Sequence, residues 1–137
     1  MNNQSKYISI FIAIIVMLGS FIANKHFNSS SFNDNLMKAS EEINTQCPIM
    51  VDKETRLDNT LGGPGNRFTY NYSLINYHKE ELDAQELINA MKPQLLNNVK
   101  TNKELALFRD NKVEMIYVYN DKKGKEVARI NIDPAEF

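Results

Sequence analysis

The chain has 137 residues, a formal net charge of −1 and 42% hydrophobic residues. This is the length of one domain and the composition of a globular protein rather than a disordered one. A near-neutral charge argues against a nucleic-acid binder, which carries a basic face and a high isoelectric point.

An uncharged apolar run, "YISIFIAIIVMLGSFIA", occupies residues 7–23. As a helix it would extend about 25 Å, close to the minimum length that spans a bilayer. The competing interpretation is a cleaved signal peptide, which prefers small residues at positions −3 and −1. Cleavage after Ala23 would place the bulky Phe21 at −3. We therefore favour an uncleaved signal anchor over residues 1–23, with the rest of the chain exported.

Residues 24–32 are polar and rich in serine, which is typical of a linker. Residues 33–137 then form the exported domain, whose length suits a single core. The first helix of this domain is expected from Asp34 to Gln46, because apolar side chains recur there every three or four residues. Pro48 ends the helix, since the residue before a proline is disfavoured in the α region.

Two strands are expected next. The short apolar run Ile49–Val51 is compatible with an edge strand, and the "GGPG" run at residues 62–65 is a strong breaker. The segment "RFTYNYSLINYH" that follows alternates apolar and polar residues, with Tyr70 and Tyr72 on the apolar side. Its polar side should contact solvent, so the sheet is covered on one face only.

The second helix has a clear start signal. Asp83 is a candidate N-cap and Glu86 follows three residues later, as in a capping box. Pro93 lies inside the apolar pattern and is expected to kink or divide the helix. Thr101 and Glu104 repeat the capping spacing, which predicts a short separate helix after them.

The chain ends in a predicted hairpin. Val113–Tyr119 and Glu126–Ile132 have strand patterns, and Gly124 between them suits a left-handed turn position. The element order is α-β-β-α-β-β after the anchor. It predicts a two-layer α+β domain, with helices on one face of a curved antiparallel sheet.

This element order resembles the cystatin-like or NTF2-like group of folds. The run "CPIMVDKETRLDNT", with "FTYNYSL" and "LLNNVKTNKEL" after it, also resembles an uncharacterised group of small exported bacterial proteins. That resemblance covers most of residues 42–134. It implies an exported bacterial protein, and it brings no known activity with it.

The residues that could support catalysis or bind metal are few. Cys47 is the single cysteine, so no disulfide can form within the chain. A pairing of Cys47 with His78 is possible but has no motif behind it, and a helix C-terminus raises a thiol pKa. His26 lies in the linker, and no zinc-type spacing of cysteine and histidine exists. We predict no catalytic residue, no metal site and no cofactor.

Two sets of residues are candidates for binding. Arg56 and Asp58 lie two positions apart, so on a strand they share one face and can pair. The pair either organises the loop before the glycine turn or forms a recognition loop. The second set is four strand tyrosines, which could grip a partner if they were exposed together: Tyr70, Tyr72, Tyr117 and Tyr119.

These observations favour a single-pass protein of the bacterial cell membrane, anchored by residues 7–23, with its domain in the periplasm or outside the cell. The expected function is non-enzymatic binding of a protein partner, as an assembly accessory, an inhibitor or an immunity-type factor. The alternative is a small ligand-binding or hydrolytic domain with a pocket between the second helix and the sheet. A third option is a structural subunit whose anchor packs with other helices.

Overall fold

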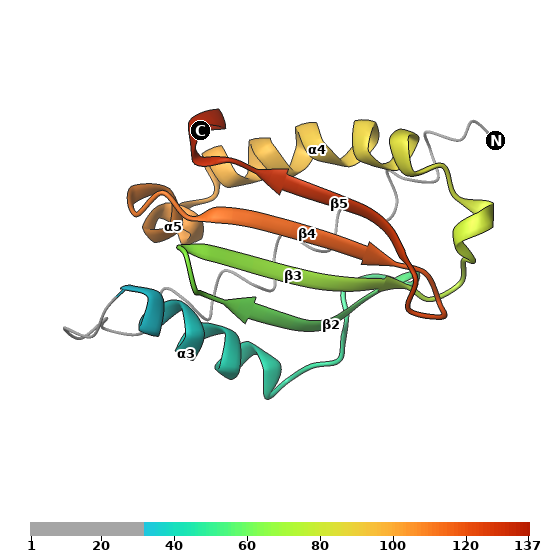
Figure 1. The fold of residues 1–137 in the computed structure, drawn as a ribbon, viewed down its shortest axis with the longest axis horizontal. Coiled ribbons are helices and arrows are strands. Elements are labelled where there is room, and N and C mark those ends of the chain that lie inside the picture. The colour runs from blue at the N-terminus through green and yellow to red at the C-terminus, as the bar shows by residue number, and fades with distance from the viewer. Residues whose placement is uncertain (1–31) are drawn as a thin grey trace.

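Residues 32–137, which the computed structural model describes, fold into an α+β domain around one sheet. The five strands lie in chain order in the sheet: β1 (Ile49–Met50), β2 (Thr55–Gly62), β3 (Arg67–Leu74), β4 (Glu114–Asn120) and β5 (Glu126–Ile132). The helices are α3 (Phe32–Asn44), α4 (Ala84–Thr101) and α5 (Ala106–Asp110), with 3-10 turns at Lys79–Glu81, Lys103–Leu105 and Pro134–Glu136. Figure 1 shows the sheet face-on, with α3 beside β2 and α4 beside β5.

The sheet is mixed, so the expectation of an antiparallel sheet was wrong. β3 and β4 run parallel, with Tyr70 opposite Tyr117 and Tyr72 opposite Tyr119. The other neighbouring strands are antiparallel. The chain between β3 and β4 contains α4 and α5, and a long crossover of this kind lets two neighbouring strands run in the same direction.

β2 is the element that the sequence pattern did not predict. Its register with β3 shifts between Leu57 and Asn59, so Leu57 lies opposite Tyr72 whereas Thr60 lies opposite Tyr70. The extra residue is a β-bulge, which breaks the strict alternation of a half-buried strand. The segment therefore looked like a loop although it forms an eight-residue strand.

The helix boundaries differ modestly from the expected ones. α3 begins at Phe32 and ends at Asn44, which leaves Cys47 and Pro48 in the turn after it. The Asp83 cap is confirmed, because its side chain accepts a hydrogen bond from the backbone N–H of Glu86 at 2.9 Å. α4 continues through the exposed Pro93, so of the expected kink or division at this residue, the division does not occur.

Packing explains why α4 is continuous. Its buried stripe extends on both sides of the proline: Leu87, Met91, Leu95 and Val99. Tertiary packing of an apolar face contributes more to helix stability than local propensity does. The separate helix α5 was expected, but Thr101 is still part of α4. Asn102 caps the 3-10 turn Lys103–Leu105 before α5, because its side chain accepts a hydrogen bond from the Glu104 N–H.

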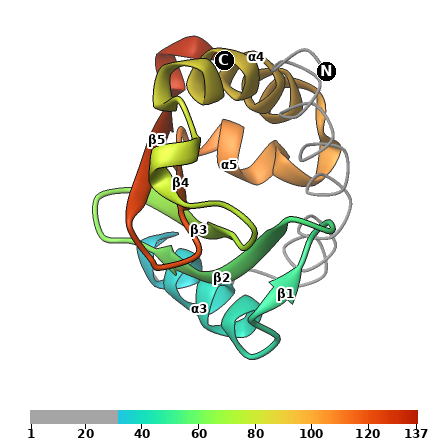
Figure 2. The same cartoon turned by 90° about the vertical axis from the view of Figure 1, so that its right-hand side faces the viewer.

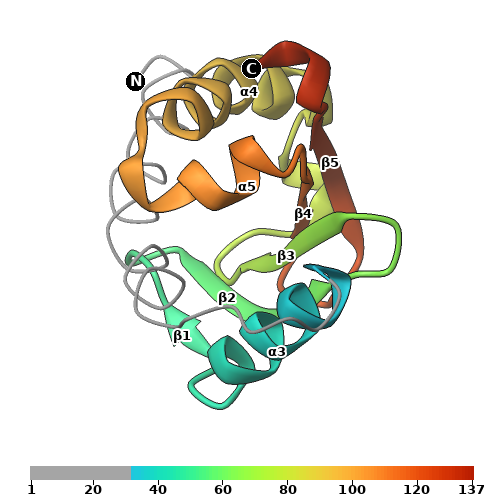
Figure 3. The same cartoon turned by 90° about the vertical axis from the view of Figure 1, so that its left-hand side faces the viewer.

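All three helices lie on the same face of the sheet. Gly62 faces the same side as its partner Phe68, and a Cβ atom built on Gly62 would lie 2.0 Å from the carbonyl oxygen of Leu36 in α3. The Phe108 ring of α5 lies 5.1 Å from the Phe68 ring, and the α4 stripe belongs to the same core. Figures 2 and 3 show the sheet curving, with α4 near its β5 edge and α3 near β2.

The predicted anchor lies outside the described residues, as does the predicted linker up to residue 31. Within residues 32–137, no helix is long and apolar enough to cross a membrane.

Candidate functional site

Four tyrosines form a double row on the helix-covered face of β3 and β4. The Tyr70 and Tyr117 rings stack at 5.1 Å, and the Tyr72 and Tyr119 rings stack at 5.2 Å. None of the four is more than 4% exposed. Burial, more than the neighbouring phenols, raises the pKa of each. The expected set of tyrosines is therefore brought together, but in the core rather than on the surface.

One end of this double row contains buried oxygen atoms that lack a hydrogen-bond partner in the described part of the chain. They are the hydroxyl oxygens of Tyr72, Tyr119 and Thr55, and the Oδ2 atom of Asp52. The Oδ1 atom of Asp52 accepts from the backbone N–H groups of Glu54 and Thr55, both at 2.7 Å. We refer to Asp52, Thr55, Tyr72 and Tyr119 as the buried oxygen cluster.

Arg56 and Asp58 lie on the opposite, open face of the sheet. The Asp58 carboxylate bridges two strands, because Oδ1 pairs with Arg56 Nε at 2.5 Å and Oδ2 accepts from the Ser73 hydroxyl at 2.5 Å. The pair thus belongs to strand β2 and does not organise a loop. The structure separates the two predicted sets of binding residues onto opposite faces of the sheet.

Exposed apolar side chains flank this ion pair. Met50 lies directly opposite Arg56 and is 47% exposed, and Leu61 further along β2 is 60% exposed. Asn59 between them is also exposed. We refer to these five residues as the β1–β2 surface: Met50, Arg56, Asp58, Asn59 and Leu61. Periodicity alone did not identify Met50 and Leu61, because Met50 lies within the short apolar run Ile49–Val51 and Leu61 is a single apolar residue in a segment without strict alternation.

Cys47 is half-buried beside the core. Burial raises the pKa of its thiol, and the nearby Asp58 carboxylate raises this pKa further. The expected direction of the shift is confirmed, although its causes are burial and a carboxylate rather than a helix terminus. A raised pKa keeps the thiol protonated and disfavours a nucleophilic role.

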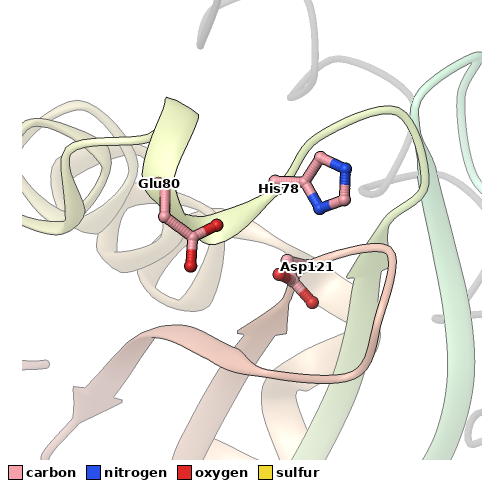
Figure 4. A group of neighbouring side chains, drawn as sticks. All are labelled: His78, Glu80 and Asp121. Carbon is pink, nitrogen blue, oxygen red and sulfur yellow. The ribbon is translucent and has the colours of Figure 1, made fainter.

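His78 lies near Glu80 and Asp121, as Figure 4 shows, with one ligand atom from each residue within 4.8 Å of the others. The Asp121 oxygens already accept hydrogen bonds from the backbone N–H groups of Lys79, Lys123 and Lys125. The Lys125 ammonium also lies 3.5 Å from a Glu80 oxygen. This cluster therefore stabilises the β4–β5 turn, and a lysine provides the positive charge that a metal would bring.

Solved structures share this fold. A protein of Pseudomonas aeruginosa assigned as secreted aligns with a TM-score of 0.59 and 17% identity, covering 80% of this chain and 98% of that one. The type II secretion system pilotin AspS of Vibrio cholerae aligns with a TM-score of 0.56 and 8% identity, covering 77% of this chain and 91% of that one. The type 2 secretion system pilotin EpsS of Vibrio vulnificus aligns with a TM-score of 0.58 and 9% identity, covering 76% of this chain and 89% of that one.

At these identities the likeness establishes the fold alone. It does not confirm the cystatin-like or NTF2-like order or the specific sequence run that we expected. No curated protein sequence matches the chain. A family model described as "Domain of unknown function (DUF8479)" matches residues 31–128, so the chain belongs to the DUF8479 family.

Proposed function

We propose that this protein is a non-enzymatic accessory of the bacterial cell envelope that binds a protein partner during assembly of a secretion machine. The observation that carries the proposal is the fold shared with two type II secretion pilotins over about three quarters of the chain (77% and 76%). The similar protein assigned as secreted supports the same compartment. Residues 7–23 anchor the protein in the membrane, and the domain projects from it into the periplasm or outside.

The β1–β2 surface is the part of the domain best suited to this role. Interfaces combine exposed apolar side chains with a charged group held in a fixed geometry. Here Met50 and Leu61 provide the apolar contacts. Arg56 and Asp58 provide opposite charges in a fixed orientation, because Ser73 also holds the carboxylate.

The four stacked tyrosines contribute to binding indirectly, by making the sheet behind the β1–β2 surface rigid. Tyr70, Tyr72, Tyr117 and Tyr119 are buried on the opposite face, where the stacked rings fix the positions of the central strands. A rigid scaffold reduces the ordering cost that a partner has to overcome on binding.

Site-specific photo-crosslinking in the native cells tests this proposal. A photoreactive residue at Leu61 should give one dominant crosslinked envelope protein. The same residue at Asn97, an exposed position in α4, should give none. Equal crosslinking from both positions, or none from Leu61, would contradict the proposed binding surface.

A further inference from the structure

The buried oxygen cluster contains oxygen atoms that no hydrogen-bond donor of residues 32–137 reaches. Asp52 Oδ2 is a carboxylate oxygen with no partner, and the hydroxyl oxygens of Thr55, Tyr72 and Tyr119 have none either among residues 32–137. Buried polar groups are nearly always hydrogen-bonded, and an unpaired one costs about 1–3 kcal/mol. Four such atoms in one region therefore require an explanation beyond packing.

The four residues that carry these atoms are neighbours in the fold. The Tyr72 and Tyr119 rings stack at 5.2 Å, and the Thr55 backbone N–H donates to the other oxygen of Asp52 at 2.7 Å. Thr55 pairs with Leu74 and Leu57 pairs with Tyr72, so Thr55 and Tyr72 are diagonal neighbours on the same buried face of the sheet. The Asp52 carboxylate also adds to the rise that burial causes in the Tyr119 pKa. The cluster thus joins the bend after β1 to the end of the tyrosine row.

The cluster also lies close to the surface. Asp52 as a residue is half-buried, and its neighbour Lys53 in the bend is exposed. The same bend follows Met50, which belongs to the β1–β2 surface. A partner that contacts Met50 is therefore within a few residues of the bend that carries Asp52.

The atoms of the cluster indicate which class of chemical group would satisfy them. All four unpaired atoms are oxygens, and one of them belongs to a carboxylate. A cation with several N–H donors satisfies a carboxylate and hydroxyl oxygens together.

We propose that Asp52, Thr55, Tyr72 and Tyr119 form a binding site for a primary ammonium group, supplied by a lysine side chain of the protein partner. The lysine enters at the bend after β1 and places its ammonium group among the four oxygens. This assignment of the donor rests on the proposed function. The ammonium chemistry itself rests on the cluster alone.

The test uses the purified full chain in detergent micelles, with ring-labelled tyrosine followed by NMR. n-Butylammonium chloride has the ammonium end of a lysine side chain and should cause saturable shifts, with half-saturation on the order of 10 mM. Tetramethylammonium chloride has the same charge but no N–H donor, and it should cause no saturable shift. Nα-Acetyl-lysine methylamide binding more tightly than n-butylammonium would indicate a peptide lysine, and the reverse order a free amine.

Substitutions separate a ligand site from a structural network. Asp52→Asn keeps the Oδ1 acceptor and should weaken n-butylammonium binding at least about tenfold, whereas Asp110→Asn on the exposed end of α5 should leave it unchanged. Tyr72→Phe and Tyr119→Phe should each weaken binding several-fold while keeping or raising the thermal unfolding midpoint, because they remove an unpaired buried hydroxyl.

Two results would overturn the ammonium site. One is the absence of saturable binding by both n-butylammonium and the lysine amide. The other is a lowered unfolding midpoint in the Tyr→Phe variants with unchanged binding, which would show that the hydroxyls satisfy one another or a buried water. Neither result bears on the crosslinking from Leu61, so the two proposals fail independently.

Discussion

Asn44 pairs with the edge of β2 in the way that a neighbouring strand would. Its side-chain amide donates to the carbonyl oxygen of Thr60 at 2.8 Å and accepts from the Thr60 N–H at 2.7 Å. β1 pairs with β2 only at Arg56 and Leu57. The side chain therefore satisfies an edge that would otherwise expose unpaired backbone groups to other chains.

Replacing the Asn44 side chain should destabilise the folded domain. We expect Asn44→Ala to lower the free energy of unfolding by roughly 1–3 kcal/mol, because two backbone groups of Thr60 lose their partners. Denaturant unfolding measures the change, with Asn97→Ala in α4 as the control for losing an exposed asparagine. Equal stability of the two variants would show that Asn44 does not protect the edge.

The sequence predicted the role of a single residue correctly where that role depends only on its neighbours in the chain. The Asp83 cap depends only on the next three residues, and Gly124 has a positive φ of 83° as the turn requires. Asn44 could not be recognised, because its partner Thr60 lies sixteen positions away. The same limit applies to Asp52 and Tyr119, which become neighbours only when the sheet forms.

At the scale of elements, α3 and β2 approach so closely that one residue has no room for a side chain. A Cβ atom on Gly62 would lie 2.0 Å from the Leu36 carbonyl oxygen, whereas nothing lies within 4 Å of a Cβ on Gly65. A backbone atom cannot move away as a flexible side chain can. The close contact therefore depends on glycine at this position of β2.

Gly62→Ala should thus separate α3 from the sheet. We expect it to lower the free energy of unfolding by at least about 3 kcal/mol, as overpacking against backbone does. Gly65→Ala should cost only about 1 kcal/mol, the strain of a left-handed position that has φ +78° and open space around it. Thermal unfolding of both variants measures the difference, and similar midpoints would contradict the close packing.

The β4–β5 hairpin depends on one carboxylate. Burial raises the Asp121 pKa, but the backbone N–H groups of Lys125, Lys79 and Lys123 outweigh it, and the pKa lies below its ordinary value. Folding therefore favours the charged form. The carboxylate stabilises the hairpin fully above its unfolded pKa of about 4, and this contribution is lost as the pH falls through the lowered folded value.

An Asp121→Asn variant should lose this part of the acid sensitivity. We expect wild type and variant to differ most in unfolding free energy at neutral pH, and to converge as the pH falls below about 4. Denaturant unfolding at several pH values measures the difference. A gap that stays constant down to the lowest pH would show that the Asp121 charge does not hold the turn.

For the molecule as a whole, the buried tyrosine row makes the folding stability depend on pH in the alkaline range. Burial raises the pKa of Tyr70, Tyr72, Tyr117 and Tyr119, so the folded state keeps their protons above pH 10, where the unfolded state releases them. Stability therefore falls as the pH rises above about 10. These four tyrosines should ionise only when the domain unfolds.

Alkaline titration tests this coupling. Tyrosinate absorbance from the buried rings should rise together with the loss of the circular dichroism signal of the folded domain. If all tyrosines ionised near pH 10 while the domain stayed folded, the rings would have to be accessible to solvent.

The α+β class and most of the elements followed from the sequence, since periodicity and breakers are local. The direction of pairing between β3 and β4 did not follow, because nothing in either strand specifies its neighbour. β2 was missed because a bulge hides its alternation. The candidate residues were found one by one, but their division between two faces of the sheet depends on the register.

The central claim is that the β1–β2 surface binds an envelope protein. The most direct test extracts the full chain from its native membranes in mild detergent and measures the mass of the complex by native mass spectrometry. We predict a fixed stoichiometry with one partner, lost in Leu61→Asp but kept in Asn97→Asp, with unchanged unfolding midpoints in both variants. A Leu61→Asp variant that keeps the full complex, or a wild type that purifies alone, would contradict the claim.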